Sequence, residues 1–293
     1  MNLLNSTGLK FFRVALLTGA ATIAFSSSAL CFSLEDLNPF GKSKYEMKLD
    51  PNVPADHLYN EGLIKIEHHD YEAAAKQFAE LQRQFPFSEW ARKGLVMEVY
   101  ANYLGESYVD AANSADRFNS LYPTAPDSAY VNYLAGQAMY GDMPDVQRDQ
   151  DRVVKALKYY QAVVDKYPKS EYAADSRYKI QICHDQLAGH ELDVGRYYLK
   201  RKNYTAAINR FREVLFKYQN TRETEEALER LTEAYLALGV TAEAETAAAI
   251  LGSNYPNSQW YKDAFDRLQA DGLAPHEHED SWISKTFRKV GLS

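Results

Sequence analysis

A short segment that begins with an aromatic residue recurs five times along this chain of 293 residues. In four of the five segments proline follows the aromatic residue, and in the other the next residue is glutamine. Proline cannot continue a helix and pushes the residue before it out of the α region. We therefore predict a corner between two helices at each segment. The corner aromatic residues are Phe85, Tyr122, Tyr167, Tyr218 and Tyr255.

An apolar stripe precedes every corner. Alanine lies eleven residues before each corner aromatic residue, and apolar residues lie seven and four residues before it. These spacings place the three side chains on one face of a helix, so each corner should end an amphipathic helix. The stripe residues are Ala74, Phe78, Leu81, Ala111, Ala115, Phe118, Ala156, Tyr160, Val163, Ala207, Phe211, Val214, Ala244, Ala248 and Leu251.

The repeat predicts the fold class. Successive corners are 37, 45, 51 and 37 residues apart, near the period of about 34 residues of the tetratricopeptide helix pair. We therefore expect an all-α protein, a right-handed α-solenoid of about five tetratricopeptide-like helix pairs. Residues 55–168 would form its N-terminal repeats and residues 169–270 its C-terminal repeats. Gly62 and Gly195 fall at offsets that the tetratricopeptide pattern expects.

The two longer intervals indicate insertions. Gly141–Asp151 is polar and reads as a solvated loop with local ion pairs, in which Asp149 and Asp151 lack the apolar pocket or nucleophile that catalysis would need. The segment Glu171–Lys202 would form one long helix or two short helices around Gly189. Hydroxyl residues after the corners should cap the helices that follow. These residues are Ser88, Ser170, Thr221 and Ser258.

The N-terminal region, residues 1–30, has the composition of a secretory signal peptide. Lys10 and Arg13 precede an apolar stretch, Val14–Phe25, that is too short to cross a bilayer as a permanent anchor. Cleavage by ordinary signal peptidase after Ala29 and lipidation of Cys31 in a lipobox both remain possible. Residues 31–54 have no helical period and resemble a tether.

The C-terminal tail, residues 271–293, carries a second, shorter apolar stripe. Ile283, Phe287 and Val290 share one face of a possible amphipathic helix, with basic residues elsewhere. This helix could meet a membrane surface or a partner, or it could be the last capping helix of the solenoid. The sequence does not separate these alternatives.

Several classes of function are disfavoured. The net charge of −7 argues against a nucleic-acid partner. No phosphate-binding loop, nucleophile elbow or H-E-x-x-H motif occurs, so we expect a non-enzyme without a cofactor. His68–His69 and His276–Asp280 are weak candidates for metal binding. Cys183 lies on an apolar helical stripe and is expected in the core.

Family-specific segments add a resemblance. DRF…YP…P…YVNYLAG begins at Asp116, RDQD begins at Arg148, and VGRYYLKRKNYTAAINRF begins at Val194. Over roughly residues 55–270 the chain resembles the BamD family of outer-membrane protein assembly factors. The resemblance implies a lipoprotein that is anchored through Cys31 to the periplasmic face of the outer membrane. It also implies that this lipoprotein is a non-enzymatic subunit of the β-barrel assembly machinery.

The resemblance also implies partners and sites. The N-terminal repeats would bind the C-terminal strands of unfolded outer-membrane proteins. Arg117 takes the position of a substrate-contacting arginine of the family, and Phe85 takes the position of an aromatic residue in the family's N-terminal groove. The family has a second arginine three residues after the first, and at that position this chain has Ser120. Tyr103 and Phe118 would pack against aromatic residues of the bound strand. The C-terminal repeats, with Arg210, would dock on a POTRA domain of the barrel subunit BamA, and other lipoproteins of the complex are expected partners.

Two other classes of protein are alternatives. A different periplasmic tetratricopeptide adaptor, coordinating cell-envelope or cell-wall machinery, would share the signal peptide and the fold. It would lack the RDQD insertion and the VGRYYLKRKNY segment. A muramidase carried on a helical superhelix would need a separate catalytic domain, and no residues remain to build one.

Overall fold

The structure, a computed structural model, describes residues 54–290. These residues belong to one compact unit. The expectations for the signal peptide, for residues 31–53 of the tether and for Cys31 lie outside the described residues, as does the side chain of Val290.

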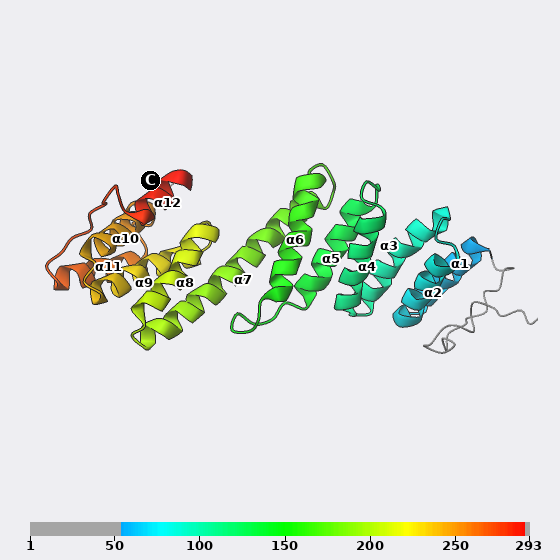
Figure 1. The fold of residues 1–293 in the computed structure, drawn as a ribbon, viewed down its shortest axis with the longest axis horizontal. Coiled ribbons are helices and arrows are strands. Elements are labelled where there is room, and N and C mark those ends of the chain that lie inside the picture. The colour runs from blue at the N-terminus through cyan, green and yellow to red at the C-terminus, as the bar shows by residue number, and fades with distance from the viewer. Residues whose placement is uncertain (1–53, 291–293) are drawn as a thin grey trace, which may run out of the picture. The chain divides into compact units, whose positions relative to one another are not determined.

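Helices make up the described part of the chain, which contains no strand (Figure 1). This confirms the predicted all-α class. The helices are α1 Ala55–Glu67, α2 Tyr71–Gln84, α3 Glu89–Leu104, α4 Tyr108–Leu121, α5 Ser128–Gly141, α6 Asp151–Lys166, α7 Ala173–Lys200, α8 Tyr204–Lys217, α9 Glu223–Ala237, α10 Thr241–Asn254, α11 Gln259–Ala270 and α12 Trp282–Val290.

Helix pairs stack in chain order. From α1 to α11 each helix packs on the next, and the first helices of neighbouring pairs also touch, α1 on α3, α3 on α5, α7 on α9 and α9 on α11. The second helices α2, α4, α6 and α8 make no comparable contact with one another. Grooves lie between α2 and α4, with α3 as the floor, and between α4 and α6, with α5 as the floor.

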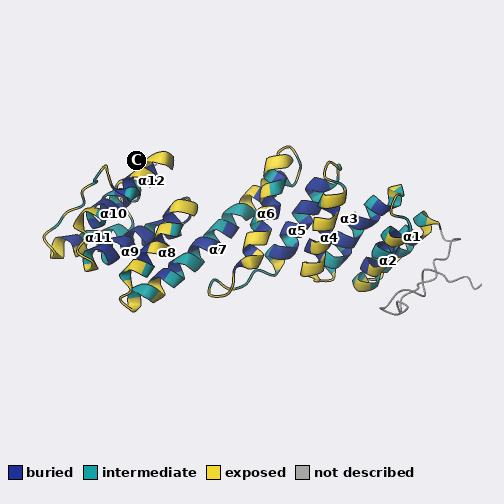
Figure 2. Ribbon diagram, in the orientation of Figure 1, coloured by how far each residue is buried: buried dark blue, intermediate teal, exposed yellow. Residues whose placement is uncertain are grey.

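The corners and the stripes lie where the sequence predicts them. Each corner aromatic residue is the C-cap of a second helix, and its backbone N–H donates to the carbonyl of the stripe residue four positions earlier. All fifteen stripe residues have 0% exposed surface. Figure 2 shows buried residues recurring on the helices from α2 to α10. Burial of this repeated stripe is the main force that holds the stack together.

Small residues permit the close approach within a pair. A Cβ added at Gly62 would lie 2.5 Å from the ring of Phe78, and a Cβ at Gly136 would lie 2.7 Å from the ring of Tyr160. Gly195 has the same relation to Phe211. An aromatic stripe residue of each of these three second helices therefore packs directly on the backbone of the preceding first helix.

We expect Gly195→Ala to lower the free energy of unfolding by up to about 2 kcal/mol. Overpacking a buried site costs about 1–3 kcal/mol, whereas alanine gains about 1 kcal/mol over glycine in a helix. Urea denaturation followed by circular dichroism would measure the change. Combining Gly195→Ala with Phe211→Leu should cost less than the sum of the two single changes. A stabilised single variant would contradict the close contact.

Two of the four predicted caps are confirmed. Ser88 accepts a hydrogen bond from the N–H of Ala91, and Ser258 accepts one from the N–H of Trp260. The other two predictions are wrong because α7 and α9 begin later than the corners suggested. The N-cap residues are Tyr172 and Arg222.

The insertions have defined structures. α7 is one helix of 28 residues that continues through Gly189, so the single-helix alternative holds. The loop between α5 and α6 is less solvated than the sequence suggests. Although Asp149 and Asp151 are exposed, Gln150 is only 8% exposed, and its side-chain amide donates to the carbonyls of Asp145 and Arg148 at 2.9 and 2.8 Å.

The tail forms α12, which packs against α10. Ile283 and Phe287 have 0% exposed surface, and Trp282 Nε1 donates to the hydroxyl of Tyr235 in α9 at 2.8 Å. Ile283 and Phe287 of the apolar stripe are thus buried against the last repeat, as the capping alternative proposes. A membrane surface could reach these two side chains only if α12 left its site.

Candidate functional site

Arg117 lies in a groove between α2 and α4, with α3 as the floor. The groove has a volume of about 430 Å³. Nη2 of Arg117 lies 2.5 Å from Oε2 of Glu98, whose residue is only 6% exposed. The guanidinium side chain itself remains 45% exposed. Since a guanidinium carries five N–H donors, one ion pair leaves donors available to a ligand.

Neighbouring side chains hold Glu98 in place beneath Arg117. The Ser114 hydroxyl donates to Glu98 Oε1 at 2.7 Å, and the Gln82 amide donates to Glu98 Oε2 at 3.1 Å. Because these hydrogen bonds hold the Glu98 carboxylate in one position, its ion pair holds the Arg117 guanidinium at the wall of the groove. The arrangement suits recognition of a carboxylate or of peptide carbonyls and supplies no nucleophile.

Tyr103 lies on a different side of α3, turned toward α5. There it joins a group of tyrosines from α3, from α5 and from the N-cap of α7, which we call the tyrosine face. Burial raises the pKa of Tyr130 to about 12, and neighbouring tyrosines add to this effect. Tyr133 stacks on Tyr172 with ring centroids 5.0 Å apart. The tyrosine face consists of Tyr100, Tyr103, Tyr130, Tyr133 and Tyr172, none of them fully buried.

The two predicted phenylalanines differ in exposure. Phe118 has 0% exposed surface and packs 5.4 Å from the ring of Tyr122, so a ligand cannot reach it. We assign Phe118 to the core, because it occupies a stripe position. Phe85 is half-buried at the end of α2. Sequence reasoning missed Phe87, which is fully exposed, although its place after a corner proline is a usable signal.

Arg210 lies in α8, far from Arg117 in the chain, and has a comparable environment. Its Nη1 is 3.0 Å from Oε2 of Glu191 in α7, and its side chain is 42% exposed. The surrounding pocket, of about 390 Å³, also includes Tyr198 and Lys217. The sequence predicts Arg117 in the N-terminal repeats and Arg210 in the C-terminal repeats. In the structure the two arginines line different pockets.

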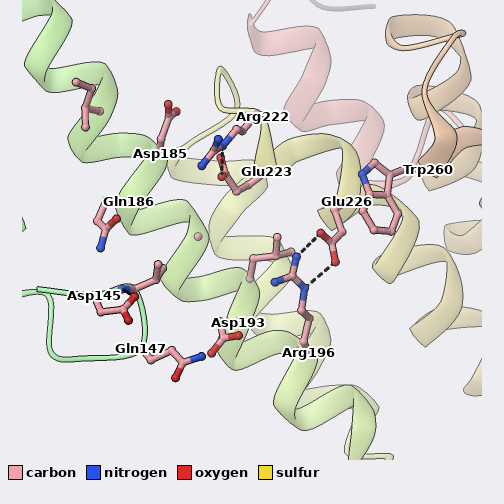
Figure 3. Close-up of a pocket in the computed structure, with 14 residues that line it drawn as sticks. Asp145, Gln147, Asp185, Gln186, Asp193, Arg196, Arg222, Glu223, Glu226 and Trp260 are labelled. Atoms are coloured by element: carbon pink, nitrogen blue, oxygen red, sulfur yellow. Dashed lines mark hydrogen bonds and ion pairs between the residues drawn. The ribbon is translucent and has the colours of Figure 1, made fainter.

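A larger pocket, of about 580 Å³, was not predicted. It lies between the loop before α6, the middle of α7 and the start of α9, and we call it the α7–α9 pocket (Figure 3). Its lining brings together residues that are 115 positions apart in the chain, from Asp145 to Trp260. Only the RDQD motif in the loop offered a sequence signal.

The described residues offer little for chemistry. Residues 54–290 contain no group of three side chains suited to a metal ion, and no helix long and apolar enough to cross a membrane. Cys183 has 0% exposed surface, as expected of a core residue, and burial raises the pKa of its thiol to about 12. The thiol therefore stays protonated and poorly reactive near neutral pH.

A family model and two relatives with similar sequences all carry names that refer to the outer membrane. The model of a family described as "Outer membrane lipoprotein" (YfiO) matches residues 51–251. A Caulobacter vibrioides protein named "Outer membrane protein assembly factor BamD" is 42% identical over 235 residues, which cover 80% of this chain and 77% of that protein. A Rickettsia prowazekii protein of the same name is 40% identical, covering 76% of this chain and 89% of that protein.

One solved structure, that of the type IV pilus biogenesis factor PilW, aligns with 71% of this chain and 96% of its own length. The identity is 15% and the TM-score 0.34.

Proposed function

This chain belongs to the outer membrane lipoprotein family whose relatives include the assembly factors named BamD, and we propose that it serves the same process. It would be a non-enzymatic subunit of the complex that assembles β-barrel proteins in the outer membrane. It would act at the periplasmic face, anchored by a lipid on Cys31. The observation that carries the proposal is the high identity to the two BamD relatives over most of both chains.

The Arg117 groove is our candidate for substrate capture. The C-terminal strand of an unfolded barrel protein would lie between α2 and α4, with its carboxylate or backbone carbonyls on the free donors of Arg117. Phe85 ends α2 one turn after Gln82, which shares Glu98 with Arg117. This position lets Phe85 meet an aromatic side chain of the strand.

Tyr103 would act on the separate tyrosine face. Partly exposed tyrosines combine a large apolar ring with a hydroxyl that can still form a hydrogen bond, which favours them at binding surfaces. This face could pack against further aromatic residues of the unfolded substrate. Phe118 has no role in this proposal, since it is a core residue.

The C-terminal repeats would dock on the POTRA domain of BamA. Arg210 supports this assignment, because its guanidinium is half-exposed beside Glu191 in a shallow pocket and can take a second carboxylate. Other lipoproteins of the assembly complex would be further partners. The match to the outer membrane lipoprotein family favours this function over that of an unrelated periplasmic adaptor.

We expect Arg117→Glu to weaken binding of a C-terminal barrel-strand peptide by roughly tenfold or more, because a carboxylate would then face both the ligand carboxylate and Glu98. Isothermal titration with the mature chain would measure the affinity, and circular dichroism would show that the helices are retained. Arg117→Gln, which removes the charge alone, should have a smaller effect.

Arg177→Glu is the matched control. Arg177 is exposed in α7, well away from the groove, and should leave peptide affinity unchanged. Equal affinity of the Arg117→Glu variant and the original chain would remove this groove from the proposed function.

A further inference from the structure

The α7–α9 pocket owes one wall to the family-specific RDQD motif. Gln150 of this motif folds the loop upon itself and is itself bonded to α7, since the amide of Gln186 reaches its side-chain oxygen at 3.4 Å. Gln186 also donates to the carbonyl of Pro144 at 2.9 Å. His190 Nδ1 lies 2.6 Å from the carbonyl of Val146. The loop is thus bound to α7 along about one helical turn, from Gln186 to His190.

Gly189 completes the attachment of the loop. A Cβ at this position would lie 3.1 Å from Cγ1 of Val146, so glycine lets the loop lie close to the helix in the middle of α7. A buried glutamine, a glycine inside a helix and several hydrogen bonds therefore fix the loop that forms one wall of this pocket.

The walls of the pocket are acidic. Five carboxylates line it, against two guanidinium groups. Arg196 is already occupied, because its Nε and Nη2 both donate to the carboxylate of Glu226. Arg222 lies on the rim with its side chain 84% exposed. The carboxylates without an ion pair are those of Asp145, Asp185 and Asp193.

Glu223 provides an independent indication of a ligand. The residue is only 9% exposed and lines the pocket from the first turn of α9 (Figure 3). Its Oε1 accepts a hydrogen bond from Nε of Arg222 at 2.9 Å, whereas its Oε2 is buried and has no hydrogen-bond partner. A buried carboxylate oxygen without a donor is costly, and a cation entering the pocket would satisfy it.

We propose that the α7–α9 pocket binds an arginine side chain of the barrel-forming subunit. The planar guanidinium can bond two carboxylates at once and can also stack on an aromatic ring. Glu223 and Asp193 supply the carboxylates. Trp260 supplies an aromatic wall with one ring face toward the guanidinium of Arg230, 5.3 Å from the ring centroid, so a ligand would meet its edge or its other face. This inference rests on the proposed function for the identity of the partner. It differs from the Arg210 contact in both charge and location.

The first test uses a probe that does not depend on the partner. The mature chain, labelled with nitrogen-15, is titrated with a capped pentapeptide that has a central arginine between serine and glycine residues. The indole resonance of Trp260, assigned with a Trp260→Phe variant, should shift with this peptide and stay in place with a glutamate-centred peptide. Absence of a shift with the arginine peptide would overturn the inference.

The second test uses the purified periplasmic domains of the barrel subunit. Glu223→Gln keeps the shape of the side chain and should weaken their affinity for the full mature chain by roughly tenfold. Asp193→Asn, a half-exposed position that tolerates substitution better, should weaken it in the same direction. Asp266→Asn, an exposed carboxylate in α11 outside the pocket, should have no effect.

The two tests separate the possible failures. If the peptide binds but all variants bind the periplasmic domains equally well, the barrel subunit does not occupy the pocket and the proposed occupant is wrong. If the unmodified chain does not bind those domains at all, the proposed docking fails along with the occupant. The peptide titration then still decides whether the pocket recognises arginine.

Discussion

Phe287→Ala in α12 should lower the free energy of unfolding by about 3–4 kcal/mol. The Phe287 side chain has 0% exposed surface in the cluster shared by α8, α9 and α10. Truncating a buried phenylalanine to alanine typically costs about 3–5 kcal/mol, because apolar contacts are lost and a cavity remains. The lower part of this range applies, since a terminal helix can undock instead of enclosing the cavity.

Undocking of α12 would itself be visible. Trp282 stacks on Phe216 with ring centroids 5.6 Å apart and donates its indole N–H to Tyr235. Hydrogen exchange of the α12 amides should therefore speed up in the Phe287→Ala variant, together with a lower urea midpoint. Lys289→Ala, an exposed change in the same helix, should alter stability by less than about 0.5 kcal/mol. Unchanged exchange in the Phe287→Ala variant would show that α12 adds little to the last repeat.

Arg267→Met should destabilise the protein by about 2–3 kcal/mol at pH 8. Arg267 Nε lies 2.8 Å from Oε1 of Glu229, a residue only 1% exposed. Removing one partner of a buried ion pair costs about 3–5 kcal/mol. The expected loss is smaller here because Arg230 still faces Glu229 and because Arg267 is 41% exposed, where solvent screens its charge.

The loss should also depend on pH. Burial raises the pKa of Glu229 above its ordinary value of 4.5, while Arg230 and Arg267 act to lower it. Without Arg267 the folded-state pKa rises further. A carboxyl group with a raised folded-state pKa binds more protons when folded, so its effect on stability becomes more unfavourable as pH increases through that pKa.

Urea denaturation at pH 5 and pH 8 would test this dependence. The difference between Arg267→Met and the unmodified chain should be larger at pH 8 than at pH 5. Lys262→Met, which changes an exposed residue of the same helix, should show no such difference. A pH-independent loss would indicate that the Arg267 side chain stabilises α11 by packing and not by compensating Glu229.

The repeated pattern alone determined the fold class, the corners and the part of the core that the second helices contribute. Apolar residues recur at the same three positions before each of the five corners. This spacing is typical of an amphipathic helix that is buried against its neighbours. The structure buries every one of those residues completely. This local signal was strong because helix periodicity involves residues only three or four positions apart.

Tertiary structure alone decided which side chains a partner can reach. Tyr103 and Arg117 were grouped from the sequence, but α3 turns the first toward α5 and α4 turns the second into the groove beside α2. Phe118 looked like a ligand contact and belongs to the core. The α7–α9 pocket joins residues distant in the chain, and no periodicity reports such an approach. Helix pattern is a local property, whereas a binding surface depends on how separate helices are placed side by side.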